Sequence, residues 1–315
     1  MTTSGSIDFS VSRDDLIKAA LQHIVAISEG DTPNSDQLTE CALLLNLIVK
    51  MRMADGMPLW ALKTGYILPT TDVSSINLGG TGGHATLSYV ETALSAAAAS
   101  AASTITVDSI TGISNSDYIG IELSDNSMQW TTINGAPSGS TITLTTALTG
   151  AASNDAQVFT YTTKLQRPLK IIKAYRYDVV NDIRTEIESL SKYDLLALSS
   201  VTSESYPYYY AYDPQLTDGI FYFYPRFNTG DYILQVTFHR PFEDFDGAAD
   251  TPDFPQEWYL PIMLELAAII GPKYGVTLKE RLSLFAEAKA YRDEVLGFSS
   301  DNDSIRIVPD TRHIK

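Results

Sequence analysis

The chain carries few of the residues that perform metal or nucleophilic chemistry. Its histidines are His23, His84, His239 and His313, and its one cysteine is Cys41. No two histidines have metal-ligand spacing, and the sequence contains neither an H-E-x-x-H zinc motif nor a G-x-S-x-G nucleophile motif. A single cysteine excludes an internal disulfide and a cysteine-rich zinc site. We therefore expect no catalytic residues, no metal site and no cofactor.

Two short segments have features of ion-binding loops, but each has a simpler interpretation. The glycines at positions 79, 80, 82 and 83 form neither a dinucleotide-binding loop nor a phosphate-binding loop, because the spacing differs and no lysine follows. They are typical of a flexible hinge. Asp244-Phe245-Asp246-Gly247 has the start of a calcium loop, but no glutamate follows at the position that would complete it. We expect a solvated loop before a helix here.

Tyrosine is the residue type that stands out, with 18 in the chain. It occupies alternate positions in two neighbouring stretches, at Tyr208 and Tyr210 and again at Tyr222 and Tyr224. A tyrosine has an apolar ring and a polar tip, which suits a protein interface. The pattern fits either a partner interface or an ordinary aromatic strand pair packed beneath helices, and the two interpretations are compatible.

Composition excludes several classes of partner. The chain has 315 residues, of which 22 are basic and 38 acidic, giving a formal net charge of −16. Such acidity disfavours tight binding of nucleic acid, which needs basic side chains at the phosphates. It also disfavours binding to anionic lipid, and no uncharged apolar run is long enough to span a membrane.

Charge also divides the chain into parts. Residues 64–163 contain no lysine or arginine, whereas the sequence on either side carries both signs. This change indicates a separate unit inserted into a host domain. Within it, short alternating segments from 104 to 163, separated by glycine turns, predict a small β-barrel or sandwich. Residues 93–103, rich in alanine and serine, fit either a short helix or a linker.

The host domain has the helical period in four places. Ser12 and Asp15 predict the start of the first helix, and Gly30 predicts its end. A second apolar stripe begins after Ser35, and a third helix is predicted over residues 258–274. A capping box at Thr277 and Glu280 predicts the start of the last helix. Between these helices, residues 165–240 contain aromatic stretches that alternate as strands do.

These patterns predict an α+β fold. It consists of a helical bundle of about four helices with an antiparallel β-hairpin region, plus an inserted small all-β barrel or sandwich domain. The predicted parts are an N-terminal helical part (1–78), an inserted β-domain (79–163), a β-hairpin region with the C-terminal helices (164–298) and an extended C-terminal tail (299–315).

Several short motifs, in order along the chain, resemble one family. The chain is similar to the head-to-tail adaptors of short-tailed bacteriophages, the tail tubular protein A-like and packaged-DNA-stabilising ring proteins. The resemblance covers roughly residues 8–75 and 165–298, and the β insertion departs from the smallest adaptors, which lack it. The motifs are Gly30-Asp31-Thr32-Pro33, Tyr212-Asp213-Pro214, Phe221-Tyr222-Phe223-Tyr224-Pro225, Arg240-Pro241-Phe242-Glu243-Asp244-Phe245 and Asp253-Phe254-Pro255-Gln256-Glu257-Trp258.

The resemblance implies a structural virion protein at the head–tail junction, made in the bacterial host cytoplasm, that is not an enzyme. Such adaptors form a dodecameric homo-oligomeric ring that joins the portal protein to the tail nozzle protein, and DNA passes through the channel without specific binding. The resemblance implies that Ile305, Ile307 and Val308 of the tail contact the portal. We expect Tyr208, Tyr210, Tyr222 and Tyr224 to contact the nozzle or a neighbouring subunit, and the insertion to contact a tail fibre or the nozzle.

Two alternatives compete with the adaptor hypothesis. In the first, the chain is a receptor- or glycan-binding tail protein of the virion, with the β insertion as its binding module and the tyrosines as a sugar platform. In the second, which the sequence supports less, it is a peptidoglycan hydrolase.

Overall fold

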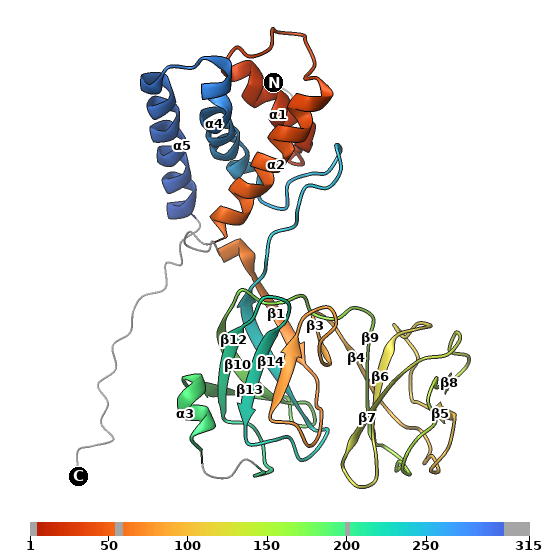
Figure 1. Cartoon of the computed structure of the whole chain (residues 1–315). Helices are drawn as coiled ribbons and strands as arrows, with labels where there is room; N and C mark the ends of the chain where they lie inside the picture. The colour runs from red at the N-terminus through yellow and green to blue at the C-terminus, as the bar shows by residue number, and fades with distance from the viewer. Residues whose placement is uncertain (1–4, 54–58, 199–201, 299–315) are drawn as a thin grey trace, which may run out of the picture. The chain divides into compact units, whose positions relative to one another are not determined.

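The computed structural model describes residues 5–53, 59–198 and 202–298 (Figure 1). The chain forms two compact units, one of which is assembled from the two ends of the chain. The first unit comprises Met1–Ala61 and Phe242–Lys315, and the second comprises Leu62–Pro241. The first is helical, whereas the second is almost entirely β.

Helices make up the described part of the first unit: α1 (Arg13–His23), α2 (Ser35–Arg52), η1 (Leu59–Ala61), η2 (Gln256–Trp258), α4 (Tyr259–Ile270), η3 (Gly271–Tyr274) and α5 (Leu278–Phe298). α4 is central, because it packs against α1, α2 and α5 (Figure 1). It is nearly all apolar, and Ile262 and Leu266 are buried with Leu16 of α1 and Leu45 of α2 in one core. No helix among the described residues combines the length and the apolarity that crossing a membrane requires.

The first helix begins where the sequence predicts and ends earlier. The backbone N–H of Asp15 donates to Ser12 Oγ at 3.2 Å, and the Asp15 carboxylate accepts from the Ser12 backbone, which confirms the expected cap. The prediction that Gly30 ends this helix is wrong. α1 ends at His23, and Val25 takes a left-handed φ of 59°. Valine rarely occupies that conformation, so no local pattern predicts this ending.

The second unit is built on an eight-stranded sheet with a short helix, α3 (Lys192–Leu196). The strands follow the order β2-β13-β12-β11-β10-β14-β1-β3, and every pairing is antiparallel except that of β11 with β12. Its core includes Phe221, Phe223 and Phe238. The strands are β1 (Leu62–Ile67), β2 (Ser75–Leu78), β3 (Ala85–Thr86), β10 (Lys170–Asp178), β11 (Ile183–Ser189), β12 (Tyr209–Pro214), β13 (Gly219–Tyr224) and β14 (Tyr232–His239).

A tight glycine turn joins the two end strands of this sheet. Gly83 N donates to the carbonyl oxygen of Asn77, within β2, at 2.7 Å, and β3 begins at Ala85, two residues after Gly83. A Cβ on Gly82 would lie 2.2 Å from the Asn77 oxygen, and one on Gly83 would lie 2.5 Å from Ile76 Cγ2. The glycines therefore serve a close backbone approach, and the sheet nearly closes into a barrel.

Between β3 and β10 the chain forms a smaller β structure with its own core. Four strands pair in the order β4-β9-β6-β7, and β5 pairs with β8. Bridges at Leu94 and Ala98 place residues 93–103 along this structure, with no helix in the segment. The strands are β4 (Val90–Ala93), β5 (Thr104–Thr106), β6 (Tyr118–Glu122), β7 (Met128–Thr132), β8 (Thr141–Thr143) and β9 (Gln157–Tyr161).

The predicted fold class is wrong. The sequence favours a helical bundle with a β-hairpin region, whereas the larger unit is an eight-stranded, nearly closed sheet. The hairpin of β12 and β13 is one part of that sheet, and residues 62–78, assigned to the helical part, supply β1 and β2. β1 pairs with β14, so that Thr64 lies opposite Thr237. Such distant pairings leave no local pattern, because the strands are short and the insertion separates their partners. The domain boundaries stay a prediction.

Candidate functional site

The second helix, α2, has two apolar faces, and only one of them is buried. Cys41, Leu45 and Ile48 lie in the core of the helical unit. Leu43, Leu47 and Met51 recur every four residues on the other side, and they are 61%, 57% and 49% exposed. Residues four apart share one face of a helix. The exposed set, which we call the α2 stripe, therefore presents a continuous apolar surface on the outside of the unit.

The last helix, α5, presents a second exposed apolar face. Leu278 and Leu282, four residues apart, are 68% and 59% exposed, and we call them the α5 stripe. Ala288, farther along α5, is buried, and α5 packs against α4. α4 lies between α5 and the α1–α2 pair (Figure 1). The two stripes therefore lie on different sides of the helical unit.

A groove adjoins the α5 stripe where α1 ends. Its volume is about 340 Å³, and its lining combines four apolar side chains with three polar ones. Val25, which holds the left-handed conformation, is one wall and is 84% exposed. A β-branched residue in that conformation is strained, and strain of this kind is found at ligand and partner sites. The remaining lining residues are His23, Ile24, Val276, Glu280, Ser283 and Leu284.

A basic pocket lies among α2, α4 and α5, and its volume is about 220 Å³. Three cationic side chains line it, Arg52, Lys289 and Arg292, together with one carboxylate, Glu265. Glu265 is buried, and its Oε2 accepts a hydrogen bond from Arg52 Nε at 2.9 Å, while Arg52 Nη2 pairs with the other oxygen. The remaining lining residues are Phe285 and Ala288. The pocket has a formal excess of two positive charges in a chain of net charge −16.

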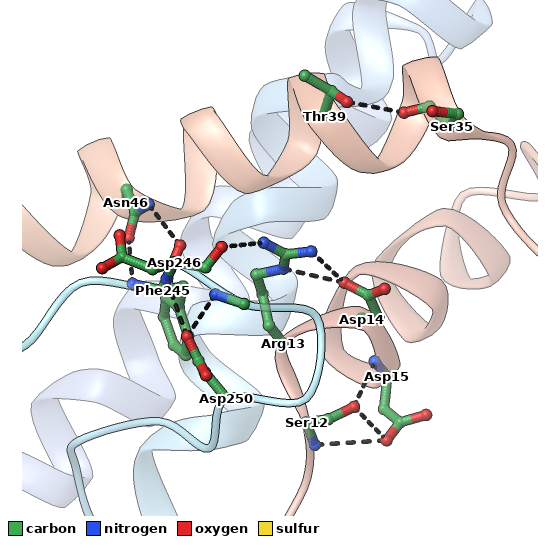
Figure 2. Close-up of polar contacts among 11 residues, drawn as sticks. Ser12, Arg13, Asp14, Asp15, Ser35, Thr39, Asn46, Phe245, Asp246 and Asp250 are labelled. Carbon is green, nitrogen blue, oxygen red and sulfur yellow. Dashed lines mark hydrogen bonds and ion pairs between the residues drawn. The ribbon is translucent and has the colours of Figure 1, made fainter.

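Residues 243–250, which we call the acidic loop, precede α4. Hydrogen bonds fix this loop on α1 and α2, as Figure 2 shows. Asn46 holds it by a double hydrogen bond: its Nδ2 donates to the Phe245 carbonyl at 3.2 Å, and its Oδ1 accepts from the Phe245 N–H at 2.9 Å. Arg13 donates to the carbonyl of Asp246, and Asp250 accepts from the Asp246 N–H at 2.9 Å. These bonds give the loop a defined shape beside the α2 stripe, which includes Leu47.

An aromatic cluster joins the smaller β structure to the eight-stranded sheet. The imidazole of His84 stacks on the indole of Trp130, and its Nδ1 lies 2.9 Å from the hydroxyl of Tyr161. Trp130 Nε1 donates to the carbonyl of Pro69 at 2.9 Å. Burial, and then the positive charge of Lys164, lower the pKa of His84 to about 4. The bulky aromatic residues of the insertion are thus packed against its host.

The four tyrosines predicted as an interface do not form one surface. Tyr210 is 4% exposed and stacks on Phe221, with 5.4 Å between ring centroids. Tyr208 is 44% exposed and lies against the half-buried Tyr224, at 5.9 Å. Tyr222 is half-buried under the ammonium of Lys192. Whether any of them contacts a partner stays a prediction.

The other predicted site residues cannot be placed. Ile305, Ile307 and Val308 lie outside the described residues. Across residues 5–53, 59–198 and 202–298, no group of three or more histidine, cysteine or acidic side chains is arranged to hold a metal ion. Leu278 and Leu282 fall in the apolar period of the last helix, whereas Leu43, Leu47 and Met51 fall outside the apolar stripe predicted for the second helix. α2 carries more large apolar residues than one buried face can hold: Leu45 is buried, whereas Leu43, Leu47 and Met51 lie on another side. This excess could have indicated an exposed apolar face.

Comparison with known proteins reveals little. No family model matches the chain, and no curated protein matches it. Among solved structures, the Gp54 tailspike of Acinetobacter baumannii bacteriophage AP22, solved in complex with A. baumannii capsular saccharide, is similar over 25% of this chain. The match has 12% sequence identity and a TM-score of 0.23, and it covers 16% of the tailspike chain. A likeness at this level does not establish a shared fold.

Proposed function

We propose that the chain is a structural protein of a bacteriophage virion. Its copies associate through the helical unit in a head-to-tail contact, by which we mean that one surface of each copy binds a different surface of the next copy. The form of assembly that we propose is the ring of a head-to-tail adaptor, placed between portal and nozzle and surrounding the DNA channel. Its partners would then be further copies of itself, the portal protein and the nozzle protein. This proposal follows the family resemblance, and one observation of the structure supports it.

That observation is the pair of unlike apolar stripes on α2 and α5, two helices that both pack against α4. The α2 stripe and the α5 stripe leave large side chains in water, and a partner would cover them. Because the two stripes differ, a contact that joins them is heterologous: each copy uses one surface to bind the next copy and the other to be bound. Repeated heterologous contacts produce a closed ring or an open filament, depending on the rotation between copies.

The charge of the chain supports a channel that DNA passes without being held. With a net charge of −16 per copy, a ring accumulates negative charge and repels phosphate. Tight binding would require clustered lysine and arginine along the channel.

Variants of the stripes test the proposal. Leu47→Glu on α2 or Leu282→Glu on α5 places a charge in the contact, and each variant should reduce the assembled fraction at high protein concentration, measured by sedimentation velocity. Leu216→Glu is the matched control, because Leu216 is 95% exposed and belongs to the other unit. If both stripe variants assembled as the unaltered chain does, the proposal would be wrong.

A second candidate function is recognition of a glycan by a phage tail protein. Tyr206 and Tyr208 are each 44% exposed, and exposed aromatic rings are surfaces on which sugar rings stack. Arg176 lies over the ring of Tyr206 at 4.7 Å and over Tyr232 at 5.5 Å, which holds this surface in place. Binding to a glycan array that is lost in Tyr206→Ala and Tyr208→Ala would favour this candidate over the adaptor.

A further inference from the structure

We infer that the basic pocket of one copy receives the carboxylates of the acidic loop of the next copy, so that charge sets the direction and register of the head-to-tail contact. The inference rests on the proposed function, since it requires that copies associate through the two stripes. It adds what the stripes alone do not provide, which is a specific polar contact beside each apolar face.

On α5, the pocket continues the apolar stripe. Lys289 follows Leu282 by seven residues, which is about two helical turns, so both lie on one face. Lys289 is exposed and lines the pocket together with Arg52, which pairs with Glu265, and Arg292, whose Nη2 lies 3.5 Å from the carboxylate of Asp293. This face of the unit is therefore apolar toward the start of α5 and basic toward its end.

On α2, the acidic loop flanks the other stripe. Asn46 clamps Phe245, and Lys50 forms an ion pair with Asp244. Asn46 and Lys50 are four residues apart and are each the immediate neighbour of a stripe residue, Leu47 and Met51 respectively. The loop backbone is therefore fixed at the level of the second half of the stripe.

The loop presents carboxylates that its own unit does not neutralise. Glu243, Asp244 and Asp246 are exposed, and Lys50 pairs with one of them, Asp244. In the described part of the chain, no ion pair takes up the carboxylate of Glu243 or Asp246. A cation supplied by a second copy would pair with them.

The two charged features lie at corresponding heights in the unit. Arg52, at the end of α2, and Arg292, near the end of α5, line one pocket, so the two helices end on the same side. On α5 the basic pocket lies beyond the apolar stripe, and on α2 the acidic loop lies beside it. Both charged groups therefore lie toward the C-terminal end of their helix. A neighbouring copy related by rotation about an axis along these helices would bring stripe to stripe and base to acid together. Opposite charges placed this way guide association and disfavour other registers.

Charge reversal on each side tests the inference. Lys289→Glu alone and Asp246→Lys alone should each weaken association by about tenfold, and the double variant should recover most of the loss. Lys63→Glu is the matched control, because it makes the same charge change at an exposed site of the other unit. Sedimentation velocity gives the assembled fraction, and far-ultraviolet circular dichroism verifies that each variant is folded.

The outcomes separate the inference from the function that it rests on. If Leu47→Glu abolishes assembly while Lys289→Glu leaves it unchanged, the head-to-tail proposal stands and the charged contact is wrong. If the double variant loses as much free energy of association as the two single variants together, the two groups do not meet, and the inference is overturned. If the unaltered chain does not assemble at high concentration, both fail.

Discussion

The imidazole of His84 lies flat on the indole of Trp130, with 3.9 Å between ring centroids and 10° between ring planes. His84 belongs to the turn that closes the eight-stranded sheet, and Trp130 belongs to β7 of the insertion. The contact therefore ties the insertion to its host, and its strength depends on the charge of the histidine, because the surrounding groups disfavour the imidazolium.

The stability of this junction should depend on pH. Burial and the nearby Lys164 lower the pKa of His84 from 6.5 to about 4, so the unfolded chain takes up a proton before the folded chain does. The stabilisation from neutral His84 is complete above pH 6.5 and is lost as the pH falls from 6.5 toward 4. The full loss is about 3 kcal/mol. Urea unfolding measured across this pH range checks it.

The matched variant for this prediction is His84→Phe, which keeps an aromatic ring on Trp130 and removes the titrating group. Its unfolding free energy should fall less steeply between pH 6.5 and 4 than that of the unaltered chain. Burial also lowers the pKa of His239, so part of the slope remains in the variant. An unchanged slope would show that His84 is protonated equally in both states.

Gly120 makes room for the indole. A Cβ at this position would lie 2.7 Å from three carbon atoms of the Trp130 ring. Gly120→Ala should displace Trp130 from His84 and destabilise the chain by about 2 kcal/mol, because the contact is with a rigid ring in a packed region. Near-ultraviolet circular dichroism and thermal unfolding measure both effects. Gly80→Ala is the control, since nothing lies within 4 Å of its Cβ position, and it should leave both signals unchanged.

The buried ion pair of Arg52 and Glu265 predicts a large loss of stability for a single variant and a small one for the double variant. Glu265→Leu leaves a guanidinium in the interior with its carboxylate removed, and should lower the unfolding free energy by about 3 kcal/mol. Arg52→Met together with Glu265→Leu replaces the pair by apolar groups and should recover most of that loss. Denaturant titration of the unaltered chain, the single variant and the double variant measures these differences in unfolding free energy. Equal losses in the single and double variants would contradict the prediction.

Val25 holds a backbone conformation that glycine adopts without strain. Because its side chain is largely exposed, Val25→Gly gives up little packing and should raise the unfolding free energy by about 1 kcal/mol. Val180→Gly is the control: Val180 is also exposed but its φ is not positive, so it should not be stabilised. Lower stability in Val25→Gly, measured by urea unfolding, would mean that the valine side chain contributes more than its conformation costs.

Elements with a local signal could be predicted from the sequence, whereas long-range pairings could not. The cap at Ser12 and the capping box of Thr277 and Glu280 follow from residue types three apart, and the structure confirms both. β10 also lies inside the stretch expected as a strand. The eight-stranded sheet could not be predicted, because β1 and β14 pair although the whole insertion separates them in the sequence.

The exposed apolar stripes and the basic pocket could not be predicted from the sequence for a different reason. An apolar period marks a helix face but does not tell whether a neighbour covers it, so Leu278 and Leu282 fit the apolar stripe of the last helix although they are exposed. The basic pocket combines residues from three helices, of which Arg52 and Lys289 are far apart in sequence. Only the packing of α4 between the other helices shows which faces remain open.

Cysteine cross-linking tests the head-to-tail contact most directly. With the buried Cys41 replaced by alanine, one chain carries Leu47→Cys on α2 and Leu282→Cys on α5, and a short bismaleimide links thiols on touching copies. A heterologous contact joins unlike surfaces, so the double-cysteine chain should give a ladder of dimers, trimers and larger products, while each single-cysteine chain stays uncrosslinked. Dimers from a single-cysteine chain, or no ladder from the double, would contradict the account.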